Sequence, residues 1–251
     1  WTVEKGDGNF RMNSFLGNTQ TKTVHLPYDA MIHEARTPDT KNGAQTGFYP
    51  GGEYIFQKHF TAPQAWQGKP VYLVFEGVYQ TALVYLNGWL LTRNVNGYAE
   101  FTVEAGPYLK YGADNLLKVI ADNSLEPNSR WYTGSGIYRP VRLLVGNKVY
   151  LPQDTVRITT READEGFALL DVTAQVQSAS TVTERVTLQQ TICREGTAVL
   201  TDRQNLLLQP GESRTVSFRY CVDSPALWSP ENPNLYTCLL YTSPSPRDRT
   251  R

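Results

Sequence analysis

The residues best equipped for chemistry lie between two strand-like runs, on a loop from Asp122 to Gly136. Asp122 and Asn123 open this loop, and Arg130 and Trp131 follow on its glycine-bearing half. An indole ring beside a guanidinium suits a sugar, because the C–H face of a sugar stacks on aromatic rings and its hydroxyls take charge-assisted hydrogen bonds. The same residue types are typical of an aromatic plug that closes one end of a β-sandwich. The residues alone leave both interpretations open.

No residue of the sequence is assigned to bond breaking. Glu53, Glu76 and Glu100 lie in strand or strand-end patterns, where a carboxylate on a solvated face is the ordinary arrangement. The three histidines have no Ser, Cys or carboxylate arrangement around them that indicates a catalytic triad or a metal site. We therefore expect neither a catalytic residue nor a metal ligand in this chain.

Charge and cysteine content argue against several classes of partner. Lys plus Arg and Asp plus Glu both number 24 in the 251 residues, so we expect no nucleic-acid partner and no anionic membrane partner. No apolar run approaches the roughly 18 residues of a membrane-spanning segment. The three cysteines are odd in number and far apart, which favours buried or idle thiols over a disulfide framework or a zinc site.

The elements around the loop read as short strands. Apolar and polar residues alternate just before the loop and again after it, and the Asn87-Gly88 pair is a hairpin signal. No 3.6-residue periodicity is present, so the pattern is typical of an all-β sandwich or jelly roll. The expected strands of this first part are residues 53–60, 71–76, 82–86, 89–91, 101–103, 116–120 and 137–145.

The strand pattern restarts near residue 147. Evenly spaced strands punctuated by Gly166, Gly196 and Pro210-Gly211 predict an immunoglobulin-like sandwich. Its expected strands are residues 156–160, 168–176, 183–191, 198–208 and 213–220. We therefore predict two all-β domains, residues 1–147 and 148–237.

Several stretches resemble the amino-terminal region of family-two glycoside hydrolases, in their β-galactosidase form. The longest runs from Ser129 to Val141 and reads SRWYTGSGIYRPV. Four more agree in the expected order over about 120 positions, and together they are far more specific than any one of them. These four are Val24-His25-Leu26-Pro27-Tyr28-Asp29, Tyr54-Ile55-Phe56-Gln57-Lys58-His59-Phe60, Val84-Tyr85-Leu86-Asn87-Gly88 and Asn96-Gly97-Tyr98.

The resemblance implies a galactose-binding-like jelly roll followed by an immunoglobulin-like spacer. It also implies the non-catalytic portion of a retaining β-galactosidase, acting on terminal β-galactosides in carbohydrate metabolism. Relatives hydrolyse the bond with two glutamates on a (β/α)₈ barrel, about 5 Å apart, and nothing in this sequence resembles those segments. The alternative is a stand-alone carbohydrate-binding or adhesive protein of two β-domains.

The resemblance also suggests site residues and partners. It places Asp122 and Asn123 at the strand end where the family supplies a sugar-contacting aspartate, with Arg130 and Trp131 close by. A strand-ending Asx turn is the alternative for Asp122, and a structural role is the alternative for Trp131. The expected partner is a β-galactoside. A homo-oligomer and a bound Mg or Na ion are expectations for the full-length enzyme only, with no cofactor in this chain.

The two ends of the chain depart from the family pattern. The sequence opens on Trp1 without an initiator Met or a signal peptide, so we expect the natural amino terminus to be missing, and any export signal with it. This leaves the compartment open, with the cytoplasm favoured over the periplasm or secretion. Residues 238–251 are rich in Pro, Ser and Arg and resemble translated sequencing-adapter sequence. We expect them to form a non-native or disordered tail that is dispensable for the fold.

Overall fold

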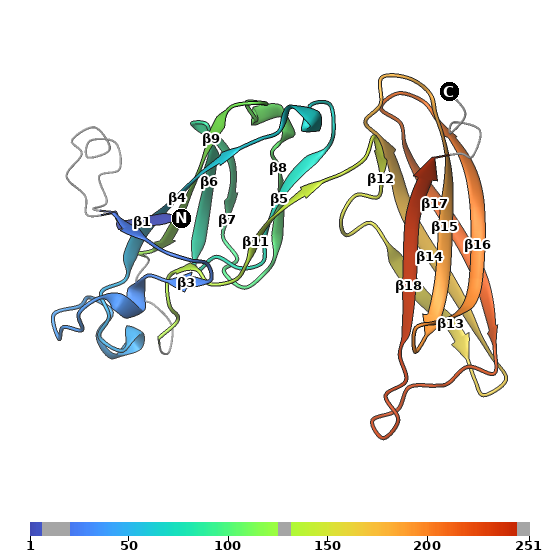
Figure 1. Ribbon diagram of the computed structural model, residues 1–251. Coiled ribbons are helices and arrows are strands. Elements are labelled where there is room, and N and C mark those ends of the chain that lie inside the picture. Colours follow the sequence, from blue (N-terminus) through green and yellow to red (C-terminus); the bar gives the residue numbers. More distant parts are fainter. Residues whose placement is uncertain (7–20, 125–131, 245–251) are drawn as a thin grey trace. The chain divides into compact units, whose positions relative to one another are not determined.

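The computed structural model describes residues 1–6, 21–124 and 132–244 (Figure 1). Its ordered elements are strands and four short 3-10 turns, with no α-helix in those ranges, so the all-β prediction is confirmed. None of the described helices could cross a membrane. The chain divides into two compact units, residues 1–145 and 146–251, and the division falls two residues before the predicted boundary.

The first unit is a sandwich of a six-stranded and a three-stranded sheet, with a short strand pair at one end. The six-stranded sheet has the order β2-β1-β4-β9-β6-β7, and the three-stranded sheet has the order β11-β5-β8. The first sheet comprises β1 (Thr2–Lys5), β2 (Lys22–Thr23), β4 (Gly52–Thr61), β6 (Thr81–Leu86), β7 (Trp89–Asn94) and β9 (Asp114–Asn123). The second comprises β5 (Val71–Phe75), β8 (Phe101–Glu104) and β11 (Val141–Val145), and the pair consists of β3 (Tyr28–Asp29) and β10 (Gly136–Ile137).

The predicted alternation explains the core of this unit. Phe56, Val84 and Val119 from the six-stranded sheet are fully buried against Val71 and Phe75 from the other sheet. The Asn-Gly hairpin between β6 and β7 has positive φ angles at both residues, as a type I′ turn requires. The predicted run 137–145 differs, because the structure divides it into β10 and β11. The short 3-10 turns are η1 (Met31–His33), η2 (Gly43–Thr46), η3 (Gln64–Trp66) and η4 (Gly106–Tyr108).

The second unit is an immunoglobulin-like sandwich. In one sheet β14 (Phe167–Ser178) is the central strand. It pairs along nearly its whole length with β17 (Ser213–Asp223), and it also pairs with β13 (Arg157–Ala163) and, near its carboxyl end, with β12 (Val149–Tyr150). The other sheet has the order β16-β15-β18, with β15 (Glu184–Arg194) between β16 (Thr197–Leu208) and β18 (Tyr236–Pro244). Apolar residues from both sheets form one core, in which Val172, Leu188, Leu208 and Phe218 are buried. This confirms the predicted fold of the second part.

The prediction of a disordered tail from residue 238 is wrong for residues 238–244. These residues belong to β18, which pairs β15 from Tyr236 opposite Arg194 to Pro244 opposite Val186. Cys238 and Leu240 face the sandwich interior on every second position, while Leu239 is exposed. Apolar residues on both faces of this stretch, such as Leu239 beside Leu240, hid the alternation. Residues 245–251 lie outside the described part of the chain.

A carboxylate on the outer face of the second unit provides a pH-dependent contribution to stability. Asp171 on β14 accepts bonds from Arg219 Nε on β17 and Arg161 Nε on β13, each at 2.7 Å. The hydrogen bond from Arg219, followed by that from Arg161, lowers the pKa of Asp171 from 3.8 to about 2.

We expect this stabilisation to be complete above about pH 4 and to be lost as the pH falls towards 2, because the folded pKa lies below the unfolded one. Urea unfolding midpoints measured between pH 2 and pH 6 should therefore fall more steeply for the native chain than for Asp171→Asn. Parallel curves for the two proteins would contradict the role of this ion pair.

Candidate functional site

The candidate site lies at the end of β9, where the sheet delivers Asp122 and Asn123 to one edge of the first unit. β9 is held between two neighbours, with Asp122 opposite Glu53 on β4 and opposite Thr81 on β6. A strand in the middle of a sheet has a fixed register, because its inward apolar residues are buried. The two side chains are therefore positioned by a rigid element and not by a loop.

Asp122 forms the Asx turn that the sequence left as an alternative. Its Oδ1 accepts hydrogen bonds from the backbone N–H and the hydroxyl of Ser124, at 2.9 and 2.6 Å. These contacts use one carboxylate oxygen. Within the described ranges the other oxygen, Oδ2, takes part in no hydrogen bond, so it remains available to a hydroxyl donor. The turn is thus established, and sugar binding by Asp122 stays a prediction.

The side chain of Asn123 is buried and holds the loop in place. It is 1% exposed, and its Nδ2 donates a hydrogen bond to the carbonyl of Gly134 at 2.9 Å. This bond joins the end of β9 to the chain that returns into β10. A side chain this buried positions the loop. Arg130 and Trp131, the other two predicted site residues, lie outside the described residues, and their roles remain predictions.

Asp29 is the residue that the sequence interpretation missed. Its Oδ1 accepts from the backbone N–H groups of Met31 and Ser135, at 3.1 and 2.9 Å, and its Oδ2 accepts from the hydroxyl of Tyr132. The backbone of β3 pairs with β10 at the same place, with Asp29 opposite Gly136. One carboxylate therefore fixes the returning chain close to Asn123.

Two glycines make this close approach feasible. Gly134 has a φ of 75°, and a Cβ there would lie 2.8 Å from Asp29 Oδ2. A Cβ on Gly136, whose φ is 145°, would lie 2.5 Å from the carbonyl oxygen of Tyr28. Any side chain at either position would push the loop away from β3. The Gly-Ser-Gly sequence is thus explained by contact with Asp29 and Tyr28.

Three tyrosines surround this carboxylate. Tyr132 packs edge-on against Tyr49, with ring centroids 5.1 Å apart. Burial, followed by the hydrogen bond to Asp29, raises the pKa of Tyr132, so its hydroxyl stays a donor at neutral pH. Tyr54 is buried, and its hydroxyl has no hydrogen-bond partner in the described part of the chain. Burial and the nearby charges of Glu34 and Asp29 raise its pKa as well.

The other candidate carboxylates and histidines are engaged elsewhere. Glu76 pairs with Arg142 at 2.7 Å, and the exposed side chains of His59 and Asp114 lie 2.6 Å apart. His33 stacks on Tyr28 with ring centroids 5.0 Å apart. No group of three or more His, Cys, Asp or Glu side chains that could hold a metal ion lies within the described residues. The three cysteines are free thiols.

The signal for Asp29 and Tyr132 was present in the sequence. Asp29 ends the Leu26-Pro27-Tyr28-Asp29 motif, and Tyr132 lies inside the loop motif. Both motifs were recognised, but their pairing spans 103 positions of sequence. No local pattern reports a contact at that separation, so only the fold could join the two motifs.

Comparison with known families and proteins supports the architecture. Residues 1–168 match the family described as "Glycosyl hydrolase 2 galactose-binding domain-like", and residues 149–245 match "Glycosyl hydrolases family 2". The chain is 31% identical over 238 residues to the β-galactosidase BoGH2A of Bacteroides ovatus, covering 94% of this chain and 28% of that protein. It is 27% identical over 247 residues to a β-glucuronidase of Bacteroides fragilis, covering 91% of this chain and 33% of that protein.

Solved structures agree with these matches. A family 2 member from Bacteroides cellulosilyticus superposes with a TM-score of 0.78 at 30% identity, covering 89% of this chain and 30% of that one. β-Glucuronidase 2 from Bacteroides uniformis gives 0.77 at 26% identity, covering 90% and 27%. The chain thus spans about a third or less of the length of these relatives. With its galactose-binding-like and immunoglobulin-like domains both matched, it belongs to the family 2 glycosyl hydrolases.

Proposed function

We propose that this chain is the amino-terminal, non-catalytic part of a retaining β-galactosidase that acts on terminal β-galactosides. Retaining hydrolysis needs a carboxylic acid and a carboxylate nucleophile about 5 Å apart. The described residues contain no α-helix and therefore no part of a (β/α)₈ barrel, so that pair belongs to the remainder of the enzyme. The contribution of this chain is to hold and select the sugar.

One observation carries the proposal: the carboxylate of Asp122 at the end of β9, with a single oxygen engaged by Ser124. A carboxylate accepts hydrogen bonds from sugar hydroxyls, which a galactoside supplies. Asn123 and Asp29 fix the chain beside it through Gly134 and Ser135. The site is thereby pre-organised, and binding does not have to order it.

A β-glucuronidase is the second candidate, because relatives named β-glucuronidase are similar to this chain over most of its length. Its substrate carries a carboxylate on the sugar ring. The free carboxylate oxygen of Asp122 would place negative charge near such a group, and like charges at short range repel. This electrostatic argument favours a neutral sugar.

The test uses the full-length enzyme that contains this chain, assayed on aryl β-galactoside and aryl β-glucuronide. We expect the galactoside to be turned over with the higher kcat/KM. Asp122→Asn should lower that value about ten- to hundredfold, because a lost charged hydrogen bond is worth roughly 1.5–3 kcal/mol. The melting temperature should change little, since the amide oxygen of Asn still accepts from Ser124.

Ser124→Ala is the matched control. It removes the hydroxyl bond to Asp122 and leaves the carboxylate in place, so we expect galactoside turnover to stay close to the native value. Faster turnover of the glucuronide by the native enzyme would establish the second candidate. A fall in melting temperature without a loss of kcat/KM in Asp122→Asn would show that Asp122 serves the turn alone.

A bound Mg or Na ion in the complete enzyme remains a prediction. The described part of the chain offers no grouping of three or more potential ligands.

A further inference from the structure

A hollow of about 370 Å³ lies in the first unit, where a surface loop leaves and rejoins the sandwich. Arg36, Thr37, Pro38 and Phe48 line it, and we call it the loop hollow. The loop comprises residues 37–48, and its ends meet because the backbone N–H of Thr37 donates to the carbonyl of Phe48 at 3.0 Å. Compact surface loops with closed ends frequently carry function.

The loop hollow lies beside the candidate site, because the chain that leaves it returns past Asn123. A Cβ on Gly51 would lie 3.0 Å from the carbonyl oxygen of Asn123, the neighbour of Asp122. Phe48 precedes Gly51 by three residues, so their Cα atoms are at most about 11 Å apart. An oligosaccharide whose terminal unit is held at Asp122 can therefore reach the loop hollow.

Phe48 has a backbone conformation that is costly for a phenylalanine. Its φ is 65°, in the left-handed region where bulky residues are outliers and asparagine or glycine is favoured. The N–H of Phe48 donates to the carbonyl of Gly43 at 2.8 Å and its carbonyl accepts from Thr37, so the loop imposes this conformation. Core packing does not explain the cost, because the ring is 37% exposed and lies outside the core of the first unit. Strained residues of this kind cluster at ligand-binding sites.

Polar groups beside the ring are oriented and available. Arg36 Nε donates to the carbonyl of Gly47 at 3.0 Å, and its guanidinium lies 5.9 Å from the ring centroid of Tyr49. Its two Nη nitrogens make no hydrogen bond within the described ranges. The hydroxyl of Thr37 accepts from the backbone N–H of Asp39 at 3.3 Å, and its own proton has no acceptor among the described residues. A sugar unit needs both an aromatic face for its C–H groups and donors for its hydroxyls.

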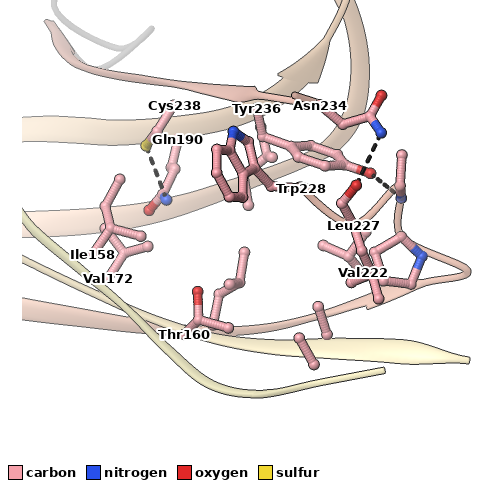
Figure 2. Close-up of a pocket in the computed structure, with 16 residues that line it drawn as sticks. Ile158, Thr160, Val172, Gln190, Val222, Leu227, Trp228, Asn234, Tyr236 and Cys238 are labelled. Atoms are coloured by element: carbon pink, nitrogen blue, oxygen red, sulfur yellow. Dashed lines mark hydrogen bonds between the residues drawn. The ribbon is translucent and has the colours of Figure 1, made fainter. Parts of the chain in front are cut away.

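The pocket of the second unit is a poorer match for a sugar (Figure 2). Its lining is mostly apolar, and no charged side chain of the described residues lines it. Three of its polar side chains, Gln190, Asn234 and Tyr236, already hydrogen-bond within the chain, as the dashed lines show. The loop hollow therefore offers the better combination of a ring and free donors.

We propose that the loop hollow binds the second sugar unit of an oligosaccharide substrate, the unit linked to the terminal galactose. The ring of Phe48 stacks on the C–H face of that unit, and Arg36 and Thr37 donate hydrogen bonds to its hydroxyls. The proposal rests on the proposed function, because the terminal sugar is placed at Asp122. It adds a substrate class, since the enzyme then favours galactosyl oligosaccharides over simple galactosides.

The test compares two substrates of the full-length enzyme that contains this chain. β-1,4-Galactobiose has a second sugar unit, and methyl β-galactoside has none. We expect Phe48→Asn to lower kcat/KM for galactobiose about three- to tenfold, as the loss of one aromatic stacking contact would, and to leave that for methyl galactoside nearly unchanged. The melting temperature of the 251-residue variant should rise by about 2–4 °C, because asparagine tolerates this φ better than phenylalanine.

Tyr108→Asn is the matched control. The Tyr108 side chain is 38% exposed, close to the value for Phe48, and it does not line the loop hollow. This variant should leave the ratio of the two kcat/KM values at its native level.

Two results would overturn the proposal. The first is a native ratio of the two kcat/KM values in Phe48→Asn, whether both values stay unchanged or fall together. The second is a lower melting temperature of Phe48→Asn, because the ring would then serve the fold.

Failure of the proposed function gives a different result. The native enzyme would then turn over glucuronides faster than galactosides. The same ratio would be measured on methyl β-glucuronide and on a disaccharide with a terminal glucuronate, so the role of Phe48 is tested in either case.

Discussion

A chain that ends at Thr237 is expected to melt at least about 10 °C lower in its second unit than the 251-residue chain. The truncation removes residues 238–244 of β18, which supply most of the ladder with β15. It also removes Leu240, which packs on the core, and exposes Leu188 and Ile192 on the strand left behind. Each apolar side chain is worth roughly 1.5–3 kcal/mol of burial, and 1 kcal/mol corresponds to about 4–8 °C in a domain of this size.

The matched control is a chain that ends at Pro244. It keeps the whole of β18 and removes only residues 245–251. Differential scanning calorimetry should show the lower transition in the first truncation and the native transition in the second. Equal melting of the chain ending at Thr237 and the native chain would mean that β18 adds nothing to the sandwich.

Asp29→Ala is expected to destabilise the first unit by about 3 kcal/mol or more. The carboxylate accepts three hydrogen bonds, from Met31, Ser135 and Tyr132. Its loss leaves these donors without an acceptor at a partly buried site, and bonds to a charged acceptor are worth roughly 1.5–3 kcal/mol each. We also expect faster hydrogen exchange at Ser135 and Gly136, because Asp29 fixes the returning chain.

Two milder variants separate the parts of this effect. Asp29→Asn retains an oxygen that can accept from the backbone of Met31 and Ser135, so it should cost less than Asp29→Ala. Tyr132→Phe removes a single hydroxyl bond and should cost least. Chemical denaturation of the three variants, with exchange followed at residues 132–136, measures this order. If Tyr132→Phe costs as much as Asp29→Ala, the hydroxyl bond and not the backbone contacts holds the site together.

The strands could be predicted where burial is one-sided and the turn chemistry is local. β6 and β9 alternate in this way over most of their length, and Asn87-Gly88 has the residues that its turn demands. β18 escaped because apolar residues occupy both of its faces, so Leu239 and Tyr241 blur the period of two. The exposure of β13 could not be predicted either, because the burial of an edge strand depends on which distant segments pack against it.

The position of the candidate site could also be predicted from the sequence, but the roles of its residues could not. Asp122 and Asn123 were placed correctly at a strand end, because the apolar run of β9 ends there. Their different tasks depend on burial, which sets Asn123 inside against Gly134 and leaves Asp122 at the edge. The role of Asp29 depends on a distant segment, and only the paired β3 and β10 bring that segment near.

The bond between Asp29 and Tyr132 also has a consequence in time. The two residues are 103 positions apart, and a ribosome adds about 5–20 residues per second. Asp29 is therefore added to the growing chain roughly 5–20 seconds before Tyr132 is added. During that interval β3 has no strand to pair with, and the high contact order of this closure makes it a late event in folding. The first unit is consequently expected to complete itself only when its last tenth has been synthesised, which leaves its amino-terminal strands dependent on protection from aggregation while the chain is still growing.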